Sequence, residues 1–226
     1  MARARIVVAI DGPAGAGKST VAAELARQLG YVLVDTGALY RGVALAAKEQ
    51  GVPWSDGPAL GKLAQSLQLA FEIGSDGNPR LQLNGRDRAN DIRTPEMSMG
   101  ASDVSKHPEV RQALLGIQRA LGQDGGVVLE GRDIGTVVFP NAEAKVFLTA
   151  SPEKRAVRRV EDLRARGIAA DFETTLNEVR TRDAQDSNRP VAPLKPAPDS
   201  VTVDTTALDI SQVVARLLEI AHSAGA

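Results

Sequence analysis

The residues of this chain best suited to chemistry are eight consecutive ones near its start. Residues 12–19 read Gly-Pro-Ala-Gly-Ala-Gly-Lys-Ser, which fits the phosphate-binding pattern G-x-x-x-x-G-K-[ST] without a gap. Glycines allow the backbone N–H groups of such a loop to point inward and form a concave anion site with the following helix. Lys18 would then reach the β- and γ-phosphates of a nucleotide, and the Ser19 hydroxyl would bind Mg²⁺. The pattern predicts a site for a nucleoside triphosphate.

The segments on either side of this loop are the ones that a phosphate-binding loop requires. Residues 5–10 form an apolar, β-branched run, as expected for a strand that is buried on both faces. Residues 19–29 have the apolar spacing of a helix, and Gly30 is placed to end it. A glycine-rich turn that binds nothing is the alternative, and these flanks favour the phosphate site over it.

Composition limits the class of protein. A chain of 226 residues with 43% hydrophobic residues is long and apolar enough for one domain with a substantial core. Its net charge of −1 argues against a general binder of nucleic acids or of membrane surfaces. The absence of cysteine excludes disulfides and thiolate metal sites. Because the apolar run near the start is too short for a signal peptide or a membrane span, we expect a cytosolic protein.

Alternating apolar runs and helical patterns predict a doubly wound α/β fold with helices on both faces of a five-stranded parallel sheet. After the strand that precedes the loop, further strands are expected at residues 31–34, 127–130, 145–149 and 201–204. Helices are expected at residues 38–50, 94–106, 108–121, 152–166 and 172–185, and from Asp209 or Ser211 onward. Thr94 and Ser151 are expected to cap two of them.

Residues 53–94 interrupt this alternation. A short helix over residues 59–67, capped by Ser55 or Asp56, leads into two apolar runs, residues 67–73 and 80–83. The turn-forming residues 74–79 lie between these runs, so the sequence predicts an antiparallel hairpin. A parallel sheet does not need such an insertion, so we expect it to cover or select the substrate; an insertion without a function is the alternative.

Polar side chains follow the predicted second strand at the point where it ends. Asp35, Thr36, Tyr40 and Arg41 should lie close to the phosphate loop, because ligands bind at the carboxyl edge of a parallel sheet. Arg41 would clamp a second phosphate there or would be an isolated surface arginine, and its position alone favours neither.

Two further groups of charged residues are candidates for the site. Arg132 and Asp133 stand between glycines at the end of the third strand, which favours a binding role over a surface ion pair. Arg155, Arg158 and Arg159 share one face of a predicted helix. They would form either a mobile cationic lid over a triphosphate or a solvated, ion-paired helix surface.

A phosphate loop indicates the nucleotide but not the reaction. A GTP-dependent switch protein would carry D-x-x-G and N-K-x-D motifs, and neither occurs in this sequence. Mechanochemical ATPases and helicases are usually larger and have more separate motifs. The remaining class is a small phosphotransferase, whose acceptor needs an arginine clamp of its own.

Four segments together carry a resemblance to a known family: residues 11–20 (DGPAGAGKST), 35–41 (DTGALYR), 131–140 (GRDIGTVVFP) and 182–189 (RDAQDSNR). In this order they closely resemble the bacterial cytidylate kinase family, a group of P-loop nucleoside monophosphate kinases. The resemblance runs over nearly the whole chain. It implies phosphorylation of CMP and dCMP by ATP with Mg²⁺ in a cytosolic, monomeric enzyme.

The resemblance also implies how the chain is divided. It implies a core of about residues 1–52, 107–150 and 190–226 and a helical lid of about residues 151–189. The insertion, of about residues 53–106, would be a small antiparallel lobe that binds the monophosphate. Thr36 stands where some relatives have Ser, and the hydroxyl is kept. Glu130 stands where an Asp is often found, which leaves open how this strand end orders the water shell of the magnesium ion.

The resemblance assigns roles to individual residues. ATP would be bound by Gly12, Pro13, Ala14, Gly15, Ala16, Gly17, Lys18, Ser19 and Thr20, with Arg155 and Arg158 from the lid. Ser19 would hold Mg²⁺, and Asp35 would reach the ion through a water. The acceptor nucleotide would be bound by Thr36, Tyr40, Arg41, Ser102, Arg111, Arg132, Asp133, Arg182, Asp186 and Arg189. Catalysis would rest on Lys18, Arg41, Arg132, Arg159 and Arg189.

Within the acceptor site these residues divide by target. The resemblance implies that Arg41, Arg132 and Arg189 hold the acceptor phosphate. Cytosine would be read by Ser102, Arg111 and Asp133, and the ribose would be held by Arg182 and Asp186. Two other interpretations remain: a kinase for another small acceptor such as shikimate or AMP, and a regulator that binds nucleotides without catalysis.

Overall fold

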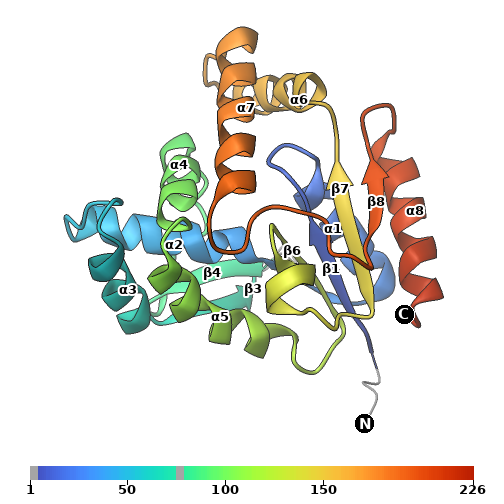
Figure 1. Ribbon diagram of the computed structural model, residues 1–226, viewed down its shortest axis with the longest axis horizontal. Coiled ribbons are helices and arrows are strands. Elements are labelled where there is room, and N and C mark those ends of the chain that lie inside the picture. The colour runs from blue at the N-terminus through green and yellow to red at the C-terminus, as the bar shows by residue number, and fades with distance from the viewer. Residues whose placement is uncertain (1–4, 75–78) are drawn as a thin grey trace. The chain divides into compact units, whose positions relative to one another are not determined.

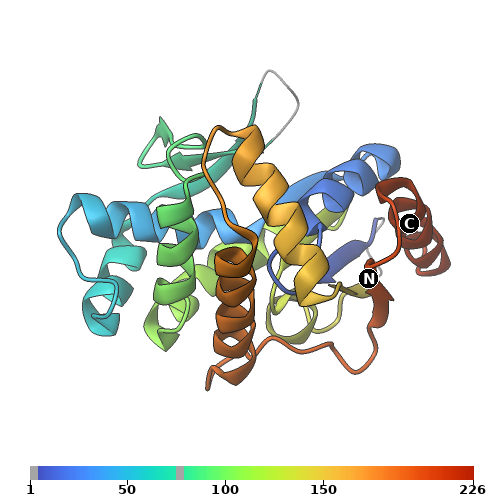
Figure 2. The same cartoon turned by 90° about the horizontal axis from the view of Figure 1, so that it is seen from above.

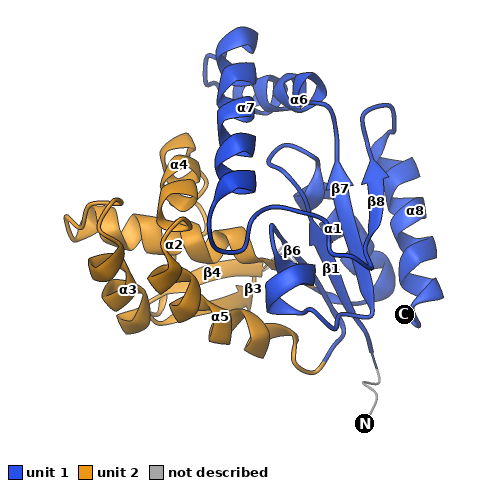
Figure 3. Ribbon diagram, in the orientation of Figure 1, with its two compact units in different colours: residues 1–32, 125–226 blue, residues 33–124 orange. Residues whose placement is uncertain are grey.

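The chain divides into two compact units. The computed structural model describes residues 5–74 and 79–226. Unit 1 comprises residues 1–32 and 125–226, and unit 2 comprises residues 33–124 (Figure 3). The phosphate loop belongs to unit 1. The turn predicted at residues 74–79 falls largely on residues 75–78, outside the described residues.

The main sheet has the predicted five strands, in the order β2-β6-β1-β7-β8 (Figure 1). The central strand β1 pairs in parallel with β6 and β7, and β7 pairs in parallel with β8. All residues of β1 are buried, as the β-branched run before the loop predicted. The strands are β1 (Val7–Asp11), β2 (Val32–Asp35), β6 (Val127–Gly131), β7 (Ala144–Thr149) and β8 (Val201–Asp204).

Two helices of unit 1 pack together and against this sheet. Helix α1 (Lys18–Leu29) contacts β1, β6 and α8 (Ile210–Ser223), and its buried side includes Val21 and Leu25. Asp209 caps α8 in a capping box with Gln212, which decides between the two predicted caps. A short π-helix, η1 (Ile134–Val138), follows β6, and the sequence pattern did not predict it.

Helices α6 (Pro152–Ala165) and α7 (Phe172–Asn188) lie side by side in both views and form a helical hairpin (Figures 1 and 2). Ser151 and Asp171 cap their first turns, each accepting a hydrogen bond from a backbone N–H three residues on. The hairpin has a small apolar cluster of its own, Ala156, Leu176 and Val179, with Phe172 packed against it.

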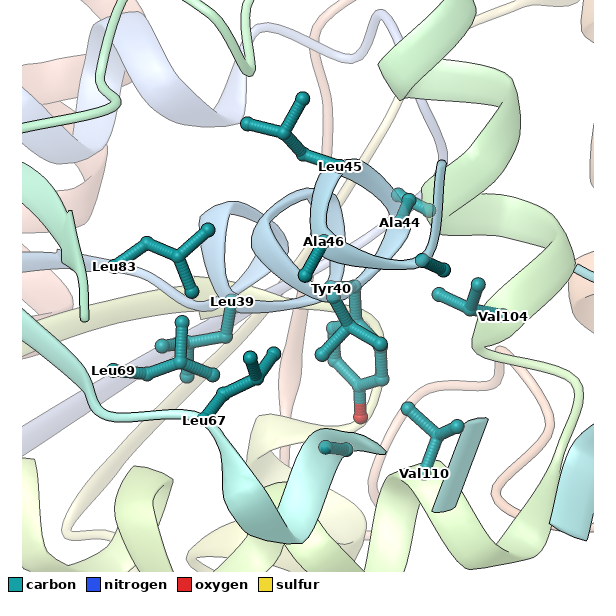
Figure 4. Close-up of a cluster of buried hydrophobic side chains, with 14 of the residues drawn as sticks. Leu39, Tyr40, Ala44, Leu45, Ala46, Leu67, Leu69, Leu83, Val104 and Val110 are labelled. Atoms are coloured by element: carbon teal, nitrogen blue, oxygen red, sulfur yellow. The ribbon is translucent and has the colours of Figure 1, made fainter. Parts of the chain in front are cut away.

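Unit 2 combines four helices with the predicted antiparallel hairpin. A short third strand, β5, was not predicted and extends the hairpin to a sheet of order β3-β4-β5. Leucine side chains of α2 and of the small sheet meet in a buried cluster (Figure 4). The elements are α2 (Thr36–Glu49), α3 (Gly57–Ser66), β3 (Leu69–Ile73), β4 (Pro79–Leu83), β5 (Arg86–Asp87), α4 (Pro95–Val104) and α5 (Pro108–Gly122).

These elements confirm the predicted architecture of a parallel sheet with helices and a small antiparallel sheet. Asp56 and Thr94 cap α3 and α4 through their side chains, as the sequence indicated. Among the helices of residues 5–74 and 79–226, none is long and apolar enough to cross a membrane.

Candidate active site at the phosphate loop

The phosphate loop joins the last residue of β1 to the first turn of α1. Gly12 has a φ of 149°, and a Cβ added there would lie 2.0 Å from the carbonyl oxygen of Leu148, so only glycine fits. Gly17, with a φ of 92°, caps α1 in the left-handed region. The loop backbone can therefore follow this path only with glycine at these points.

Lys18 is folded back onto this loop. Its Nζ donates hydrogen bonds to the carbonyl oxygens of Gly12 (2.8 Å) and Pro13 (2.7 Å), and the residue is 5% exposed. Burial, and next the positive charge of Arg132, lower the pKa of Lys18 to about 7, although Glu130 opposes them. The lysine is thus a desolvated cation whose charge a phosphate would stabilise.

Arg155 ties the loop to both helices of the hairpin. Its Nη1 donates to the carbonyl oxygen of Ala14 (3.1 Å), and its Nε donates to that of Ala150 (2.9 Å). The same guanidinium makes a two-pronged ion pair with Asp183 of α7, at 2.9 and 2.5 Å. With 3% of its side chain exposed, Arg155 acts as a buried link between the loop, α6 and α7.

The other two arginines predicted for the lid differ in their contacts. Arg158 donates to the hydroxyl (3.0 Å) and carbonyl (2.8 Å) oxygens of Thr205, beside the loop. Arg159 is about one-third exposed and faces Asp162 of its own helix at 3.7 Å. The structure therefore brings Arg155 and Arg158 to the loop, whereas the printed contact of Arg159 is to a residue of its own helix.

Asp183 was missed by sequence reasoning. It lies within the segment of residues 182–189 that the sequence singled out, and it precedes Asp186 by three positions on the same helix. Neither its type nor its spacing distinguished it from the other acidic residues of this helix.

Three of the predicted acceptor-site arginines converge on one buried carboxylate, that of Asp186. Arg132 Nε donates to it at 3.2 Å, and Arg189 Nη1 lies 3.9 Å from it. Burial alone would raise the pKa of Asp186, but the charges of Arg132, Arg182 and Arg189 hold it below its usual value. Three cations around one anion leave positive charge that suits a phosphate.

Asp133 is 4% exposed and directly precedes η1, where its carbonyl oxygen accepts the N–H of Val137 at 2.9 Å. Asp133 belongs to unit 1, as do Arg132, Arg182, Asp186 and Arg189. This unit therefore contains the loop and half of the residues predicted for the acceptor.

The remaining predicted acceptor residues belong to unit 2 and are polar groups set into its core. Arg41 pairs with Asp35 through its Nη2, and the guanidinium of Arg111 lies 5.6 Å from the ring centre of Tyr40. Thr36 is buried, and so is Ser102.

Two atoms of these residues have no hydrogen-bond partner within the described chain. They are Nε of Arg41 and Oγ of Ser102, and both are buried. Because an unsatisfied buried polar atom costs free energy, such atoms are rare unless a ligand or water supplies the partner. Both belong to the residues that the sequence predicted for the acceptor nucleotide.

The residues predicted for magnesium fit an ion that is held mainly by its nucleotide. Ser19 is exposed in the first turn of α1, where its hydroxyl oxygen is available as a ligand. The carboxylate of Asp35 is already paired with Arg41. No cluster of three His, Cys, Asp or Glu side chains suited to a metal occurs among the described residues. Mg²⁺ commonly takes one or two protein ligands together with phosphate oxygens and waters.

Comparisons with known proteins show the family to which this sequence is similar. The family described as Cytidylate kinase matches residues 8–223 of the chain. A protein of Syntrophotalea carbinolica named Cytidylate kinase is 50% identical over 96% of this chain and 92% of its own length. Proteins of the same name from Exiguobacterium sibiricum and Pasteurella multocida are 51% and 47% identical, covering 97% and 95% of this chain and 98% and 94% of their own lengths.

A solved structure is similar in fold. The gluconokinase of Sinorhizobium meliloti superposes with a TM-score of 0.50 and 17% sequence identity over 98% of this chain and 94% of its own. At this identity the likeness concerns the fold alone.

Proposed function

The chain belongs to the cytidylate kinase family, and from this premise we propose that it transfers the γ-phosphoryl group of ATP to CMP and dCMP. The products would be ADP with CDP or dCDP. Residues 8–223 match the family, and relatives of that name share about half of the residues over nearly the whole chain. Sequence and site geometry thus support the same class of reaction.

The observation that carries the proposal is that unit 1 has two groups of cationic side chains, each suited to an anion. One is the phosphate loop with the desolvated Lys18, and the other is the cluster of Arg132, Arg182 and Arg189 around Asp186. A nucleotide-binding regulator would need only the first. A kinase that joins a triphosphate to a monophosphate needs both.

On the donor side, we assign the phosphates of ATP to residues 12–20, with Lys18 at the β- and γ-phosphates. Mg²⁺ would be held by the Ser19 hydroxyl and the nucleotide, with Asp35 reaching it through a water, and it would neutralise charge on the transferring phosphoryl group. Arg155 and Arg158 would support the loop from outside, because their present bonds go to its backbone and to Thr205. Arg159, which pairs only loosely with Asp162 of its own helix, would reach the transferring group.

On the acceptor side, we assign the phosphate to Arg41, Arg132 and Arg189. Asp186 with Arg182 would hold the ribose, and Thr36 and Tyr40 would line the site. Arg41 would then exchange part of its ion pair with Asp35 for the phosphate. The buried Nε of Arg41 supports this assignment, since a phosphate oxygen would satisfy it.

The cytosine ring would be read by Ser102, Arg111 and Asp133. Cytosine offers an amine donor and two acceptors, N3 and O2, on one edge. A carboxylate at Asp133 can accept from the amine, while Arg111 and the Ser102 hydroxyl can donate to the acceptors. The buried Ser102 Oγ without a partner supports its place in this set.

The chemical step needs no general base, because the acceptor oxygen of a monophosphate is already ionised near neutral pH. Catalysis would rest on in-line alignment of the two phosphates and on positive charge around the transferring group. Lys18 and the arginines supply that charge in a site from which a closing helical hairpin would exclude water. We place this activity in a cytosolic monomer.

An acceptor panel tests the proposal. ADP release is measured with ATP and Mg²⁺ in the presence of CMP, dCMP, UMP, AMP, GMP or shikimate, and without an acceptor. We expect CMP and dCMP to be turned over, and UMP to have a kcat/KM lower by about 100-fold or more, because uracil reverses the donors and acceptors that the site reads. Equal use of UMP and CMP would contradict the assigned base readers. Preference for shikimate or AMP would replace the proposed substrate, and ADP release without any acceptor would indicate a hydrolase.

A further inference from the structure

Asp11, the last residue of β1, is a buried carboxylate to which the proposed reaction assigns no role. It is 4% exposed. Its Oδ1 accepts the N–H of Ile134 and its Oδ2 accepts the N–H of Gly135, both at 2.8 Å. These are the first N–H groups of η1, which a helix cannot satisfy by itself. Asp11 therefore caps η1 from a strand that lies far away in the sequence.

This cap fixes the turn that carries Arg132. Asp11 pairs with Gly131 in the sheet, and its side chain holds the residues that directly follow the turn of residues 131–133. Arg132 in turn donates from Nη1 to the carbonyl oxygen of Gly131 (3.0 Å) and from Nε to Asp186. Because the phosphate loop starts at Gly12, one residue joins the start of the donor loop to the turn with the acceptor arginine.

We propose that Asp11 is a positioning residue, whose carboxylate holds the turn of residues 131–133 beside the phosphate loop and so aligns Arg132 with the nucleotide phosphates. This inference rests on the proposed function, since it assigns Asp11 a part in the same transfer. Alignment is a large part of such catalysis, and a displacement of about 1 Å can cost a hundredfold in rate.

The role depends on ionisation, because only a carboxylate accepts hydrogen bonds at both oxygens. A proton on one oxygen would face an N–H group and break that bond. Burial, first of all, raises the pKa of Asp11 to about 6, and Asp133 raises it further, against the hydrogen bonds from Gly135 and Ile134 and the charge of Lys18. At the end of β1 where Asp11 lies, the charged groups on the surrounding elements are Lys18 on α1, Glu130 on β6, Asp133 before η1 and Lys145 on β7.

Protonation of Asp11 loosens the turn without unfolding the protein. The native pKa of about 6 lies above the ordinary value of 3.8, so the native state binds this proton more tightly than the unfolded state does. As the pH falls from about 6 towards 4, Asp11 therefore adds to the free energy of unfolding. If protonation of Asp11 lowers the activity but not the free energy of unfolding, Asp11 aligns Arg132 and does not merely stabilise the fold.

The first test compares Asp11→Asn with Glu143→Gln. Glu143 accepts the N–H of Val7 at the opposite end of β1, at 2.9 Å, and is the matched control. An amide can accept only one of the two hydrogen bonds, so kcat with CMP should fall about 10- to 100-fold in Asp11→Asn, while KM for ATP stays within about twofold. Glu143→Gln should keep the wild-type values.

The pH profile of kcat completes this test. CMP itself takes up a proton near pH 6, so both proteins lose activity in acid. The wild type should show an additional fall between pH 7 and 5 that Asp11→Asn lacks. An unchanged kcat in Asp11→Asn, an equal rise of KM for ATP and for CMP, or identical pH profiles would overturn the proposal.

A second measurement needs neither a variant nor a nucleotide. In an NMR titration of the free protein, the amides of Ile134 and Gly135 and the Nε–H of Arg132 should shift together with a midpoint near pH 6. The Nε–H of Arg189, which donates to the carbonyl oxygen of Ala192 at 2.6 Å, is the control and should shift less. Asp186 does not interfere, because its pKa is held below the usual range, and Lys18 titrates at a higher pH, with a pKa of about 7.

The two outcomes separate this inference from the proposed function. If the amides and Arg132 do not titrate together, Asp11 does not control the turn and the inference is wrong, whatever the enzyme phosphorylates. If the wild type fails to use CMP, the proposed function is wrong, while a joint titration would still support the coupling of Asp11 to Arg132.

Discussion

The phosphate loop and the helical hairpin are adjoining parts of unit 1 that are held in place in different ways. Four loop carbonyl groups, those of Gly12, Pro13, Ala14 and Ala16, accept hydrogen bonds from the side chains of Lys18, Arg155, Arg158 and Thr205. The two helices of the hairpin are joined by a small apolar cluster and by the ion pairs of Arg155 with Asp183 and of Glu153 with Arg180. The phosphate loop is thus held by hydrogen bonds to its own backbone, and the helical hairpin is held by contacts between side chains of its two helices.

This difference separates two tasks of a phosphotransferase. Bonds within the loop keep its N–H groups directed at the phosphates before a nucleotide arrives, which lowers the cost of binding. Few contacts in the hairpin keep opening and closing cheap, because segments with little buried apolar surface move at low free-energy cost. Arg155 belongs to both regions, because it donates a hydrogen bond to the loop carbonyl of Ala14 and pairs with Asp183 of the hairpin.

The largest expected effect is on the turnover rate and comes from a substitution in the phosphate loop. Lys18→Ala should lower kcat on the order of a thousandfold, since the charge nearest to the transferring phosphoryl group is lost. Steady-state rates with CMP measure it, and circular dichroism checks that the variant folds. The control is Lys154→Ala, which removes an exposed lysine of α6 and should leave the rate unchanged. Near-normal turnover in Lys18→Ala would show that the loop is not the site.

The next effect compares the buried side of α1, which packs on the main sheet, with the apolar cluster of the hairpin. Leu25 is fully buried under the sheet, so Leu25→Ala should lower the free energy of unfolding by about 2–5 kcal/mol. Leu176→Ala should lower the global value less and should instead speed hydrogen exchange within α6 and α7. Denaturant titration and exchange mass spectrometry measure the two quantities. Equal loss of global stability in both variants would place the hairpin within the cooperative core.

The smallest expected effect concerns the ion pair of Arg155 and Asp183, which links the loop to the hairpin. Asp183→Asn leaves the buried Arg155 without its carboxylate, so it should cost about 1–3 kcal/mol of stability and raise KM for ATP several-fold. The matched control is Glu153→Gln, which breaks the exposed pair of Glu153 with Arg180 between the same two helices and should cost less than about 0.5 kcal/mol. Equal effects would mean that Arg155 does not couple the hairpin to the loop.

The sequence predicted the architecture well because the fold depends on local patterns. The apolar run before the loop is buried throughout, as β1. Thr94, Ser151 and Asp209 cap the helices that the sequence assigned to them. The two-residue strand β5 escaped prediction, because so short a segment has no periodicity to detect.

The site was predictable in its motifs but not in its internal contacts. Residues 12–19 identify a phosphate loop by type and spacing alone. Nothing in the sequence indicates that Asp11 caps η1, because the hydrogen bonds join residues 123 and 124 positions apart. The burial of Arg155 could not be predicted either, since the same helix carries the half-buried Arg158 and Arg159 and the exposed Arg164, and only tertiary packing distinguishes them.

Lys18 donates two hydrogen bonds to carbonyl groups of its own loop in the absence of a nucleotide. A phosphate that approaches the loop must therefore replace the carbonyl oxygens of Gly12 and Pro13 as the acceptor of the lysine hydrogen bonds. Part of the attraction between ammonium and phosphate is spent on breaking the two bonds to the loop, and those bonds form again when the phosphate departs. The lysine regains both bonds as ADP leaves, which favours rapid product release and repeated turnover over tight retention of the nucleotide.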